Sequence, residues 1–473
     1  MQSDSFTSLS LEPRFLANLA TLGYHHMTQV QAETLPSVLA GRDLIAQAKT
    51  GSGKTAAFGI GILNKLNPAW FAVQGLVLCP TRELADQVAG ELRRLARGVG
   101  NVKILTLTGG VSMRPQIASL EHGAHIVVGT PGRIRDHLGR ATLDLSKVQT
   151  LVLDEADRMT DMGFYDEIAG IVSATPVHRQ TLLFSATYPD DIRFATAGFL
   201  RDPLEVKVEG KHSLEAIDQR FYEIGFEGRE EAVGRLLKAH RPVSALAFCN
   251  TKARCRELAD SLQAQGFSAL ALYGELEQQE RDEILVLFSN RSCSVLVATD
   301  VAARGLDIAD LDTVINVDVS RDPEVHVHRV GRTGRAGASG MAHTLVAPNE
   351  KKWVRLVEEY QNQEAIWENL DALGEHQEPA APAPMVTLCV AGGKKAKLRP
   401  GDLLGALTGD AGLTREQVGK INIGEFNSYI ALERTIAEAA VARLGQGDAP
   451  GPGFGAIKGR WFKMRFVEVR ALP

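Results

Sequence analysis

A glycine-rich segment that ends in Lys and Thr is the first part of the chain whose residue types can do chemistry. It reads Ala48-Lys49-Thr50-Gly51-Ser52-Gly53-Lys54-Thr55 and leads into an apolar helical stretch. Glycines let backbone N–H groups converge on phosphate oxygens, and the N-terminus of the following helix adds positive potential. The Lys then reaches the β- and γ-phosphates, and the next hydroxyl binds magnesium. Although the strict pattern has Gly where Ala48 stands, we predict a nucleotide site formed by Thr50, Gly51, Ser52, Gly53, Lys54 and Thr55.

A second candidate site is the acidic run Asp154-Glu155-Ala156-Asp157, which directly follows the apolar run 151–153. Residues just beyond the C-terminal end of a strand in a parallel sheet face the ligand crevice. An acid there can hold magnesium, and its neighbour can orient the attacking water. For this segment alone, a solvated acidic turn is the alternative. Beside a phosphate loop, the run favours Asp154 as a Mg²⁺ ligand with Thr55, and Glu155 as a catalytic carboxylate.

Short apolar runs indicate the elements that must position these residues. The runs alternate with amphipathic stretches such as 82–96, and the pattern starts again in the second part of the chain. Strands that alternate with helices predict parallel sheets. We therefore predict an α/β fold with two tandem parallel-sheet domains that are joined near 209–213. The predicted strands are 76–79, 104–107, 126–128, 151–153 and 182–184, followed by 245–248, 269–272, 295–298 and 314–317.

A proline-rich segment marks a second boundary. Residues 374–384 have no apolar periodicity and contain three prolines, which is typical of an extended, semi-rigid linker. Beyond it, short strands alternate with two helices, and the alternating run 461–467 predicts an antiparallel strand with one wet face. The predicted organisation is a first domain at 1–208, a linker at 209–215, a second domain at 216–370, a linker at 371–385 and a C-terminal α+β domain at 386–473.

Composition and charge bound the class of protein. The 473 residues are 44 % apolar and 23 % charged, as in soluble globular proteins. The first residues lack a basic start and an apolar stretch, so we expect no signal peptide, and no apolar run of about 18 residues predicts a membrane span. Five scattered cysteines without a CxxC pair predict reduced thiols in a cytoplasmic protein. The net charge is −5, but from Met385 onward 13 basic residues face 8 acidic ones. This excess favours a polyanionic partner for the C-terminal domain, with chance fluctuation as the alternative.

The order of the motifs resembles that of a known family. DEAD at 154–157 after GSGKT at 51–55 resembles the DEAD-box RNA helicases of helicase superfamily 2, and other family motifs follow from residue 6 to about residue 350. The resemblance implies two RecA-like domains, ATP and Mg²⁺ as cofactors, and RNA-stimulated ATP hydrolysis that separates short RNA duplexes. Phe6, Tyr24 and Gln31 resemble the adenine-reading Q motif, in which Met27 stands where Pro is usual.

The resemblance also implies further site residues, and RNA contacts through the backbone that are largely sequence-blind. Gly305 and Asp307 would complete the ATP site, and Ser185, Thr187 and His328 would couple hydrolysis to strand separation. The implied RNA contacts are Pro80, Thr81, Arg82, Gly110, Thr130, Pro131, Gly132 and Arg133 in the first domain, and Asn250, Thr251, Gln278, Arg281, Thr299 and Asp300 in the second.

Two arginines in the run 328–335 are candidate catalytic residues. Arg332 and Arg335 are three residues apart, so on a helical turn they would share one face. Ion pairing inside the second domain is the alternative. The resemblance implies arginine fingers, which stabilise the charge that develops on the γ-phosphate. The ATP site would then be divided between the two domains, and their closure could depend on RNA.

The segment 385–473 resembles the RNA-binding domain of the DbpA branch of this family, on residues 387–410 above all. This implies an RRM-type βαββαβ fold, a hairpin of large-subunit ribosomal RNA as the ligand, and a role on the pre-ribosomal large subunit. The predicted strand 427–432 offers only Tyr429 for base stacking. We predict RNA binding through two basic groups, for which a solvated surface is the alternative: Lys394, Lys395, Lys397 and Arg399, and then Lys458, Arg460, Lys463 and Arg465.

The sequence therefore predicts a monomeric, cytoplasmic ATP-dependent RNA helicase that acts in large ribosomal subunit assembly. A non-catalytic RNA clamp is one alternative, against which the intact Lys54, Glu155, Arg332 and Arg335 argue. A DNA helicase is the other, and comparing stimulation by DNA and by RNA would decide it.

Overall fold

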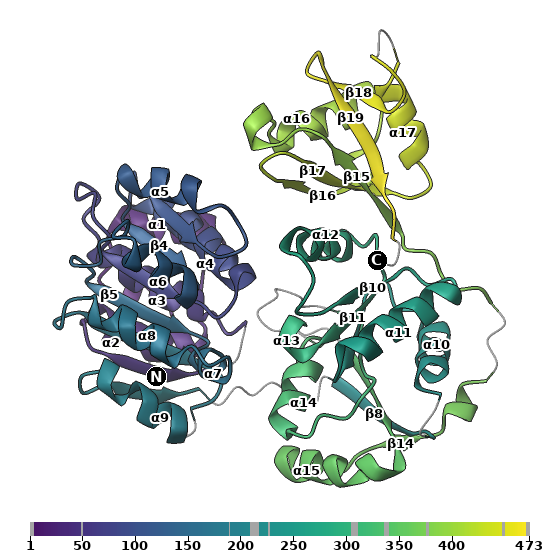
Figure 1. Ribbon diagram of the computed structural model, residues 1–473, viewed down its shortest axis with the longest axis horizontal. Helices are drawn as coiled ribbons and strands as arrows, with labels where there is room; N and C mark the ends of the chain where they lie inside the picture. Colours follow the sequence, from purple (N-terminus) through teal and green to yellow (C-terminus); the bar gives the residue numbers. More distant parts are fainter. Residues whose placement is uncertain are drawn as a thin grey trace. The chain divides into compact units, whose positions relative to one another are not determined.

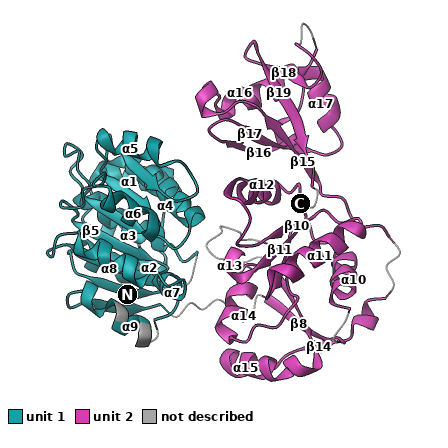
Figure 2. Ribbon diagram, viewed as in Figure 1, with its two compact units in different colours: residues 1–211, 305–307 teal, residues 212–304, 308–473 magenta. Residues whose placement is uncertain are grey.

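The computed structural model describes residues 4–48, 51–188, 190–208, 217–225, 228–303, 311–334, 340–374, 378–446 and 450–469. The chain forms two compact units (Figure 2). Unit 1 comprises residues 1–211 and 305–307, and unit 2 comprises residues 212–304 and 308–473. Unit 2 holds both a second parallel sheet and the C-terminal domain (Figure 1).

Unit 1 is built on a parallel sheet in the order β3-β4-β2-β5-β6-β1-β7. The four central strands read as continuous apolar runs because both of their faces are covered. The phosphate loop follows β1, and the acidic run and the predicted RNA contacts of unit 1 lie at the C-terminal ends of β2, β3, β4 and β5, where a parallel sheet places its ligand crevice. The strands are β1 (Leu44–Gln47), β2 (Gly75–Leu78), β3 (Ile104–Leu107), β4 (Ile126–Gly129), β5 (Thr150–Asp154), β6 (Gln180–Ser185) and β7 (Leu204–Lys207).

Helices cover both faces of this sheet, so two apolar cores lie on either side of it. One core includes side chains of α2, α3 and α4, and the other includes side chains of α6, α7 and α8. The helices are α1 (Pro13–Thr21), α2 (Gln29–Leu39), α3 (Lys54–Lys65), α4 (Arg82–Leu95), α5 (Met113–Glu121), α6 (Pro131–Gly139), α7 (Ala156–Asp161), α8 (Tyr165–Ser173) and α9 (Asp190–Thr196).

The parallel sheet of unit 2 repeats the topology of unit 1. Its order is β10-β11-β9-β12-β13-β8-β14, which is the order of the first sheet with every strand number raised by seven. The strands are β8 (Ile217–Glu223), β9 (Ala245–Cys249), β10 (Ala269–Leu272), β11 (Val295–Thr299), β12 (Thr313–Asn316), β13 (Gly340–Val346) and β14 (Trp367–Glu368). The helices are α10 (Arg229–His240), α11 (Lys252–Ala264), α12 (Gln278–Ser289), α13 (Asp300–Ala303), α14 (Pro323–Val330) and α15 (Lys351–Gln361).

The C-terminal domain is a small antiparallel sheet in the order β16-β17-β15-β19-β18. Its elements are β15 (Met385–Val390), α16 (Pro400–Gly405), β16 (Val418–Ile423), β17 (Ser428–Glu433), α17 (Ala437–Leu444), β18 (Phe454–Ile457) and β19 (Arg460–Val467). The expected βαββαβ pattern is present, and β18 is an additional strand that pairs with β19. The predicted α/β fold of two parallel-sheet domains followed by a small α+β domain is confirmed.

Within 374–384, the described residues form no helix or strand, but they pack against their neighbours. Ala380 lies against the core of the second parallel-sheet domain, and Ala383 is fully buried. The Arg434 side chain donates a hydrogen bond to the Ala383 carbonyl. The C-terminal domain is therefore attached to the second parallel-sheet domain through contacts along the linker as well as through the chain itself.

Two general expectations concern the whole chain. All five cysteines are free and buried. Among the described residues, no helix combines the length and apolar character that crossing a membrane would require.

Candidate ATP and RNA sites

The phosphate loop lies between β1 and α3. Gly51 and Gly53 have φ angles of 79° and 95°, a left-handed conformation that glycine adopts without steric cost. Lys54 is only 6 % exposed, and its Nζ donates a hydrogen bond to the Ala48 carbonyl at 2.9 Å. The lysine charge is thus held at the loop, where phosphate would compete for it. Thr50, which we predicted for this site, lies outside the described residues.

The N-terminal end of α2 holds the phosphate loop through hydrogen bonds. Gln31 is 1 % exposed, and its Nε2 donates to the Gly53 carbonyl at 3.1 Å while its Oε1 accepts from the Thr28 N–H at 2.9 Å. The Thr28 hydroxyl donates to the Ser52 carbonyl at 2.7 Å. The bond from Gln31 to Gly53 connects the predicted adenine-reading glutamine directly to the phosphate loop. Its other amide atom is held by the Thr28 backbone.

Two aromatic residues predicted for the adenine side are neighbours. The rings of Phe6 and Tyr24 meet edge to face with centroids 6.2 Å apart. The Tyr24 hydroxyl donates to Glu91 at 2.6 Å. Burial, the hydrogen bond to Glu91 and the charge of that carboxylate raise the pKa of Tyr24 above its usual value, so the phenol stays neutral.

The acidic run combines a buried carboxyl group with a strained neighbour. Burial raises the pKa of Asp154 to about 7, whereas the nearby Lys54 charge lowers it. Among the described residues, Asp154 Oδ1 is buried without a hydrogen-bond partner. Glu155 has φ 55° and ψ 55°, a left-handed conformation that costs a residue with a Cβ atom about 1–2 kcal/mol. Its Oε2 accepts from Arg158 Nη1 at 3.1 Å.

Asp157, the last residue of the run, clamps the loop after β6. Its Oδ2 accepts from the backbone N–H groups of Ala186 and Thr187 at 3.2 and 3.0 Å and from the Thr187 hydroxyl at 3.1 Å. The Asp157 N–H donates to the Ser185 hydroxyl at 3.1 Å. We did not single out Asp157 from the sequence, although it is the fourth residue of the motif. The clamp joins the nucleotide side of unit 1 to the predicted coupling residues.

The predicted RNA contacts of unit 1 lie on neighbouring loops at the same end of the sheet. Arg82 packs so closely on Gly110 that a Cβ atom there would lie 1.7 Å from its Nη1. Arg133 donates to the Val111 carbonyl at 3.1 Å and to Gln116 Oε1 at 3.0 Å. Two arginines therefore shape the loop after β3. The remaining predicted residues form the N-terminal ends of α4 and α6, which suit anions: Pro80, Thr81, Thr130, Pro131 and Gly132.

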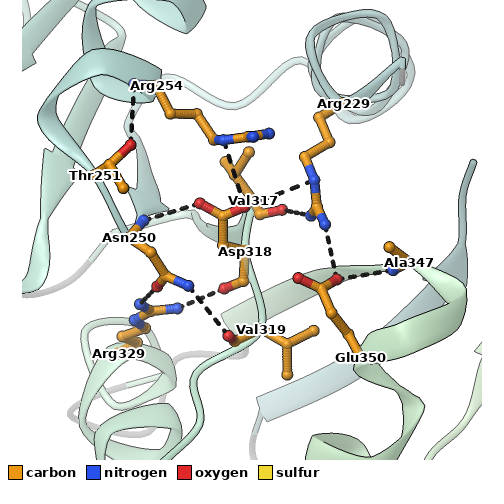
Figure 3. A network of polar contacts seen from close by, with 10 residues as sticks. All are labelled: Arg229, Asn250, Thr251, Arg254, Val317, Asp318, Val319, Arg329, Ala347 and Glu350. Atoms are coloured by element: carbon orange, nitrogen blue, oxygen red, sulfur yellow. Dashed lines mark hydrogen bonds and ion pairs between the residues drawn. The ribbon is translucent and has the colours of Figure 1, made fainter. Parts of the chain in front are cut away.

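In unit 2, one buried arginine joins three loops at the strand ends, and Figure 3 shows its bonds to two of them, at Asn250 and Asp318. Arg329 is 2 % exposed and makes a two-pronged ion pair with Asp300, with both N···O distances 2.6 Å. It also donates to Asn250 Oδ1 at 3.0 Å and to the Asp318 carbonyl at 2.7 Å. Through these bonds Arg329 fixes the positions of Asn250 and Asp300, which are both predicted RNA contacts. We did not single out Arg329, although the run 328–335 contains it.

A second arginine extends this network toward α15. Arg229 is buried, lies 3.6 Å from Asp318 and donates to Glu350 at 2.7 Å (Figure 3). Asp318 in turn accepts from the Asn250 N–H at 2.9 Å. Nothing in the sequence pattern pointed to Arg229 or Asp318, because their link joins segments far apart in the chain.

The other predicted residues of unit 2 occupy the same edge of its sheet. Thr251 caps α11, Thr299 ends β11, and Arg281 donates to the Tyr273 carbonyl at 3.1 Å. Gln278 begins α12 and donates to Asp282 at 2.8 Å. His328 lies in α14, and Arg332 follows that helix. Gly305, Asp307 and Arg335 lie outside the described residues.

The first basic group of the C-terminal domain lies on the loop after β15. The loop is connected to the β16–β17 turn, because Lys394 N–H donates to Gly424 O at 2.9 Å and Lys395 N–H donates to Glu425 O at 3.0 Å. The four predicted side chains are all exposed: Lys394, Lys395, Lys397 and Arg399.

The second basic group divides between two places. Arg460 donates to the Ala396 carbonyl at 3.0 Å, which places it beside the first group. Lys458 pairs with Asp402 at the start of α16, and Lys463 is exposed on β19. Arg465 lies 3.8 Å from Glu283 of α12, at the contact with the parallel-sheet domain.

The contact between the C-terminal domain and the parallel-sheet domain of unit 2 involves the outer face of β15. Thr387 is fully buried, and its hydroxyl bonds Ser292 Oγ at 2.7 Å and Asn290 Nδ2 at 3.1 Å. The Met385 N–H donates to the Arg291 carbonyl at 3.3 Å. The sheet face that RRM domains use for base stacking is thus partly covered by the helicase domain.

Comparisons with known proteins agree with these features. Three family models match the chain: DEAD/DEAH box helicase at 28–194, helicase conserved C-terminal domain at 228–337 and DbpA RNA binding domain at 387–453. The ATP-dependent RNA helicase DbpA of Escherichia coli K12 is 50 % identical over 98 % of this chain and all of its own length. CshA of Geobacillus kaustophilus is 46 % identical over 73 % of this chain and 74 % of its own.

Solved structures give the same assignment. Dbp5 of S. cerevisiae bound to RNA and ADP BeF3 is 29 % identical, with a TM-score of 0.72 over 78 % of this chain and 96 % of its own. Mss116p bound to ssRNA and AMP-PNP is 28 % identical, with a TM-score of 0.69 over 78 % and 80 %. The chain belongs to the DEAD-box ATP-dependent RNA helicases, and it carries the DbpA RNA-binding domain at its C-terminal end.

Proposed function

We propose that this RNA helicase is stimulated by a hairpin of large-subunit ribosomal RNA and acts, as a cytoplasmic monomer, in assembly of the large ribosomal subunit. The observation that carries the proposal is the DbpA RNA-binding domain at 387–453, with its exposed basic loop 394–399. A hairpin bound there would place neighbouring duplexes within reach of the helicase domains at high effective concentration.

Phosphate binding would begin with an exchange of partners at Lys54. The lysine would leave the Ala48 carbonyl for the β- and γ-phosphates, and the Gly51–Thr55 backbone would cradle them. Gln31 would read adenine, with Phe6 and Tyr24 beside it. Gly305 and Asp307 would complete the nucleotide site.

A magnesium ion fits the acidic site because Asp154 Oδ1 is buried without a partner among the described residues. Asp154, partly through water, and the Thr55 hydroxyl would hold Mg²⁺, since hard cations prefer oxygen ligands. When bound, the ion neutralises phosphate charge during hydrolysis.

Glu155 would orient the attacking water and accept its proton. The ion pair with Arg158 at 3.1 Å holds the carboxylate in place, which preserves its geometry for this task. Arg332 and Arg335 would stabilise the charge that develops on the transferred phosphoryl group.

The RNA backbone would lie along the strand-end loops of both units, on the predicted residues described above. Asp157 would transmit a change at the nucleotide site to the RNA-binding loops, because one of its carboxylate oxygens binds the 186–187 backbone and the Thr187 hydroxyl. Ser185, Thr187 and His328 would then couple the nucleotide state to strand separation.

The test compares ATPase stimulation by large-subunit ribosomal RNA fragments and by unrelated hairpins of equal length. The full chain should respond to the best ribosomal fragment at concentrations about tenfold lower, a difference of ~1.4 kcal/mol. A chain ending at Gly374 should respond to both equally weakly. The cut follows Gly374 because Arg235 holds Leu370 O and Asp371 in the second domain. Equal preference in both chains would refute the proposal.

A triple substitution locates the RNA contact within the full chain. Replacing Lys394, Lys395 and Lys397 by Ala should weaken binding of the ribosomal fragment and reduce the slope of log K against log salt by up to about 2–3, because fewer counterions are released. Replacing the exposed Lys147, Lys207 and Lys352 makes the same change of net charge and should leave the slope unaltered.

A further inference from the structure

A groove in unit 2 lies between α12 and the C-terminal domain. Its volume is about 800 Å³, within the range of roughly 300–1,000 Å³ that is usual for ligand pockets. One wall consists of α12 side chains, namely Gln279, Asp282, Glu283 and Val286. The opposite wall consists of Lys394, 398–400 and 421–427 of the C-terminal domain, with Tyr429.

The two walls are held at a fixed separation. Buried Thr387 joins them through Asn290 and Ser292, and Asn422 Nδ2 donates to Asn290 Oδ1 at 3.3 Å. The Met385 N–H bond to Arg291 O adds a backbone link. A groove whose walls are fixed in advance loses little conformational entropy when a ligand enters.

The rim of the groove on the C-terminal domain is rigid as well. The 394–395 backbone pairs with the Gly424 and Glu425 carbonyls. Gly393 lies so close to this turn that a Cβ atom there would be 2.4 Å from the Gly424 oxygen. The basic loop and the turn that carries Phe426 therefore form one structural element.

An exposed aromatic ring stands on this rim. Phe426 is 64 % exposed, and Lys395 Nζ lies 4.2 Å from the centre of its ring. An exposed ring flanked by cations is a usual platform for an unpaired base, whose phosphate the cations can contact. The groove thus combines a stacking surface with positive charge at one edge.

The α12 wall carries the opposite charge. Glu283 Oε2 accepts from the Tyr429 hydroxyl at 3.4 Å and lies 3.8 Å from Arg465 Nη2, and Asp282 accepts from Gln278. An ionised carboxylate offers about four acceptor positions. Carboxylate oxygens accept N–H donors, so this wall suits a ligand that presents such donors.

We propose that this groove binds one unpaired nucleotide of the RNA and prefers guanine. The base edge faces Asp282 and Glu283, and the phosphate lies at Lys394 and Arg399. Guanine has two adjacent N–H donors, N1 and N2, on its Watson–Crick edge, whereas adenine, cytosine and uracil each place an acceptor beside their donor. The helicase domain then contributes through α12 to the base specificity that the proposed function assigns to the C-terminal domain.

The test measures binding of labelled uridine pentamers that carry guanine, inosine, adenine, cytosine or uracil at the centre, by anisotropy with the full chain and without ATP. The guanine pentamer should bind about tenfold more tightly than the adenine pentamer, as expected for one bidentate contact. Inosine lacks the N2 amino group and should fall between them. Asp282→Asn and Glu283→Gln should each reduce the guanine preference to about twofold or less while the uracil pentamer binds as before.

Asp260→Asn is the matched control, because Asp260 is an exposed carboxylate on α11 and should leave the preference unchanged. Amide exchange at Met385 monitors the contact between the two domains, and it should stay protected in both groove variants. A guanine preference that persists in both variants, or no preference among the pentamers, overturns the proposal.

The proposal for the groove and the proposed function can be refuted independently. Loss of ribosomal preference on truncation at Gly374, together with unchanged pentamer discrimination in the α12 variants, would refute the groove alone. Equal ATPase preference in the full and truncated chains would refute the proposed function, whatever the pentamers do.

Discussion

The polar residues at the strand ends of the two parallel sheets are organised differently. In unit 1, Lys54 bonds a backbone carbonyl, and Asp154 Oδ1 has no partner among the residues that the structure describes. In unit 2, Arg329 is saturated by Asp300, Asn250 and the Asp318 carbonyl. The two sheets have the same strand order, yet their strand-end residues differ in role. Lys54 and Asp154 can take a new partner, whereas Arg329 holds neighbouring loops in place. The comparison predicts that substitution of Lys54 or Glu155 affects chemistry, whereas substitution of Arg329 affects stability.

The largest effect is expected for Glu155→Gln. Turnover of ATP at saturating RNA should fall at least about 100-fold, because the attacking water loses its base, while ATP affinity stays within about twofold. Steady-state ATPase assays and nucleotide titration measure the two quantities. Glu121→Gln, on the exposed end of α5, is the control. Turnover within about twofold of the unsubstituted chain would exclude Glu155 as the base.

Arg329→Met should destabilise unit 2 by about 3–5 kcal/mol, because it leaves the Asp300 carboxylate without its buried partner. Hydrogen exchange of amides in β9 and β11 reports the loss, whereas β2 and β5 amides of unit 1 should exchange as before. The control is Arg256→Met on the exposed face of α11. If exchange in unit 2 were unaffected, the bracing role would be wrong.

Lys54→Met should lower the stability of unit 1 by only about 1 kcal/mol, the usual contribution of one hydrogen bond. Hydrolysis should nevertheless be lost, since the phosphates lose their cation. Exchange of β1 and β6 amides and ATPase assays test both parts. A stability loss as large as that of Arg329→Met would remove the contrast between the units.

The last prediction concerns the stability of unit 2 in acid. Burial, and then the Arg329 charge, lower the pKa of His326 to about 3 from a usual 6.5. Below pH 6.5 the unfolded chain binds the proton more readily, so the stabilising effect of the neutral ring is complete above pH 6.5 and is lost as pH falls toward 3. The slope approaches about 1.4 kcal/mol per pH unit for one histidine.

His343, whose pKa burial also lowers to about 3, should add to this acid sensitivity. His326→Asn keeps a donor for Gln219, which the ring contacts at 3.2 Å. It should flatten the pH dependence of β8 and β13 exchange between pH 6.5 and 5. The exposed His25→Asn in unit 1 should not. An unchanged slope in His326→Asn would show that this ring does not carry the effect.

The central strands could be predicted from the sequence because burial on both faces makes them continuous apolar runs. All nine predicted runs lie on strands, some shifted by one residue. β7 and β8 were not predicted, because partial exposure gives them an alternating pattern of apolar and polar residues instead of a continuous apolar run. β1 was not predicted, although its apolar run Leu44-Ile45-Ala46 is as long as the predicted run 126–128. The linker 374–384 was predicted as a spacer, and its packing through Ala380 and Ala383 depends on tertiary contacts that composition does not encode.

The site could be predicted as far as each residue lies within a contiguous motif. Lys54, Asp154 and Glu155 fall into that class, although their roles stay predictions. Partners that join distant segments could not be found, as with Asp318 and Arg229, which are 89 positions apart in the chain. The acidic wall that α12 presents to the C-terminal domain has the same origin, since Asp282 and Glu283 come to lie beside that domain only in the folded chain.

The backbone at Glu155 has a consequence for how this enzyme can change through evolution. Its left-handed φ of 55° is a conformation that glycine adopts without the cost imposed by a side chain. Glycine at this position would relieve the backbone cost but would remove the carboxylate that pairs with buried Arg158. The two effects oppose each other, so the cost of this conformation alone does not favour losing the glutamate.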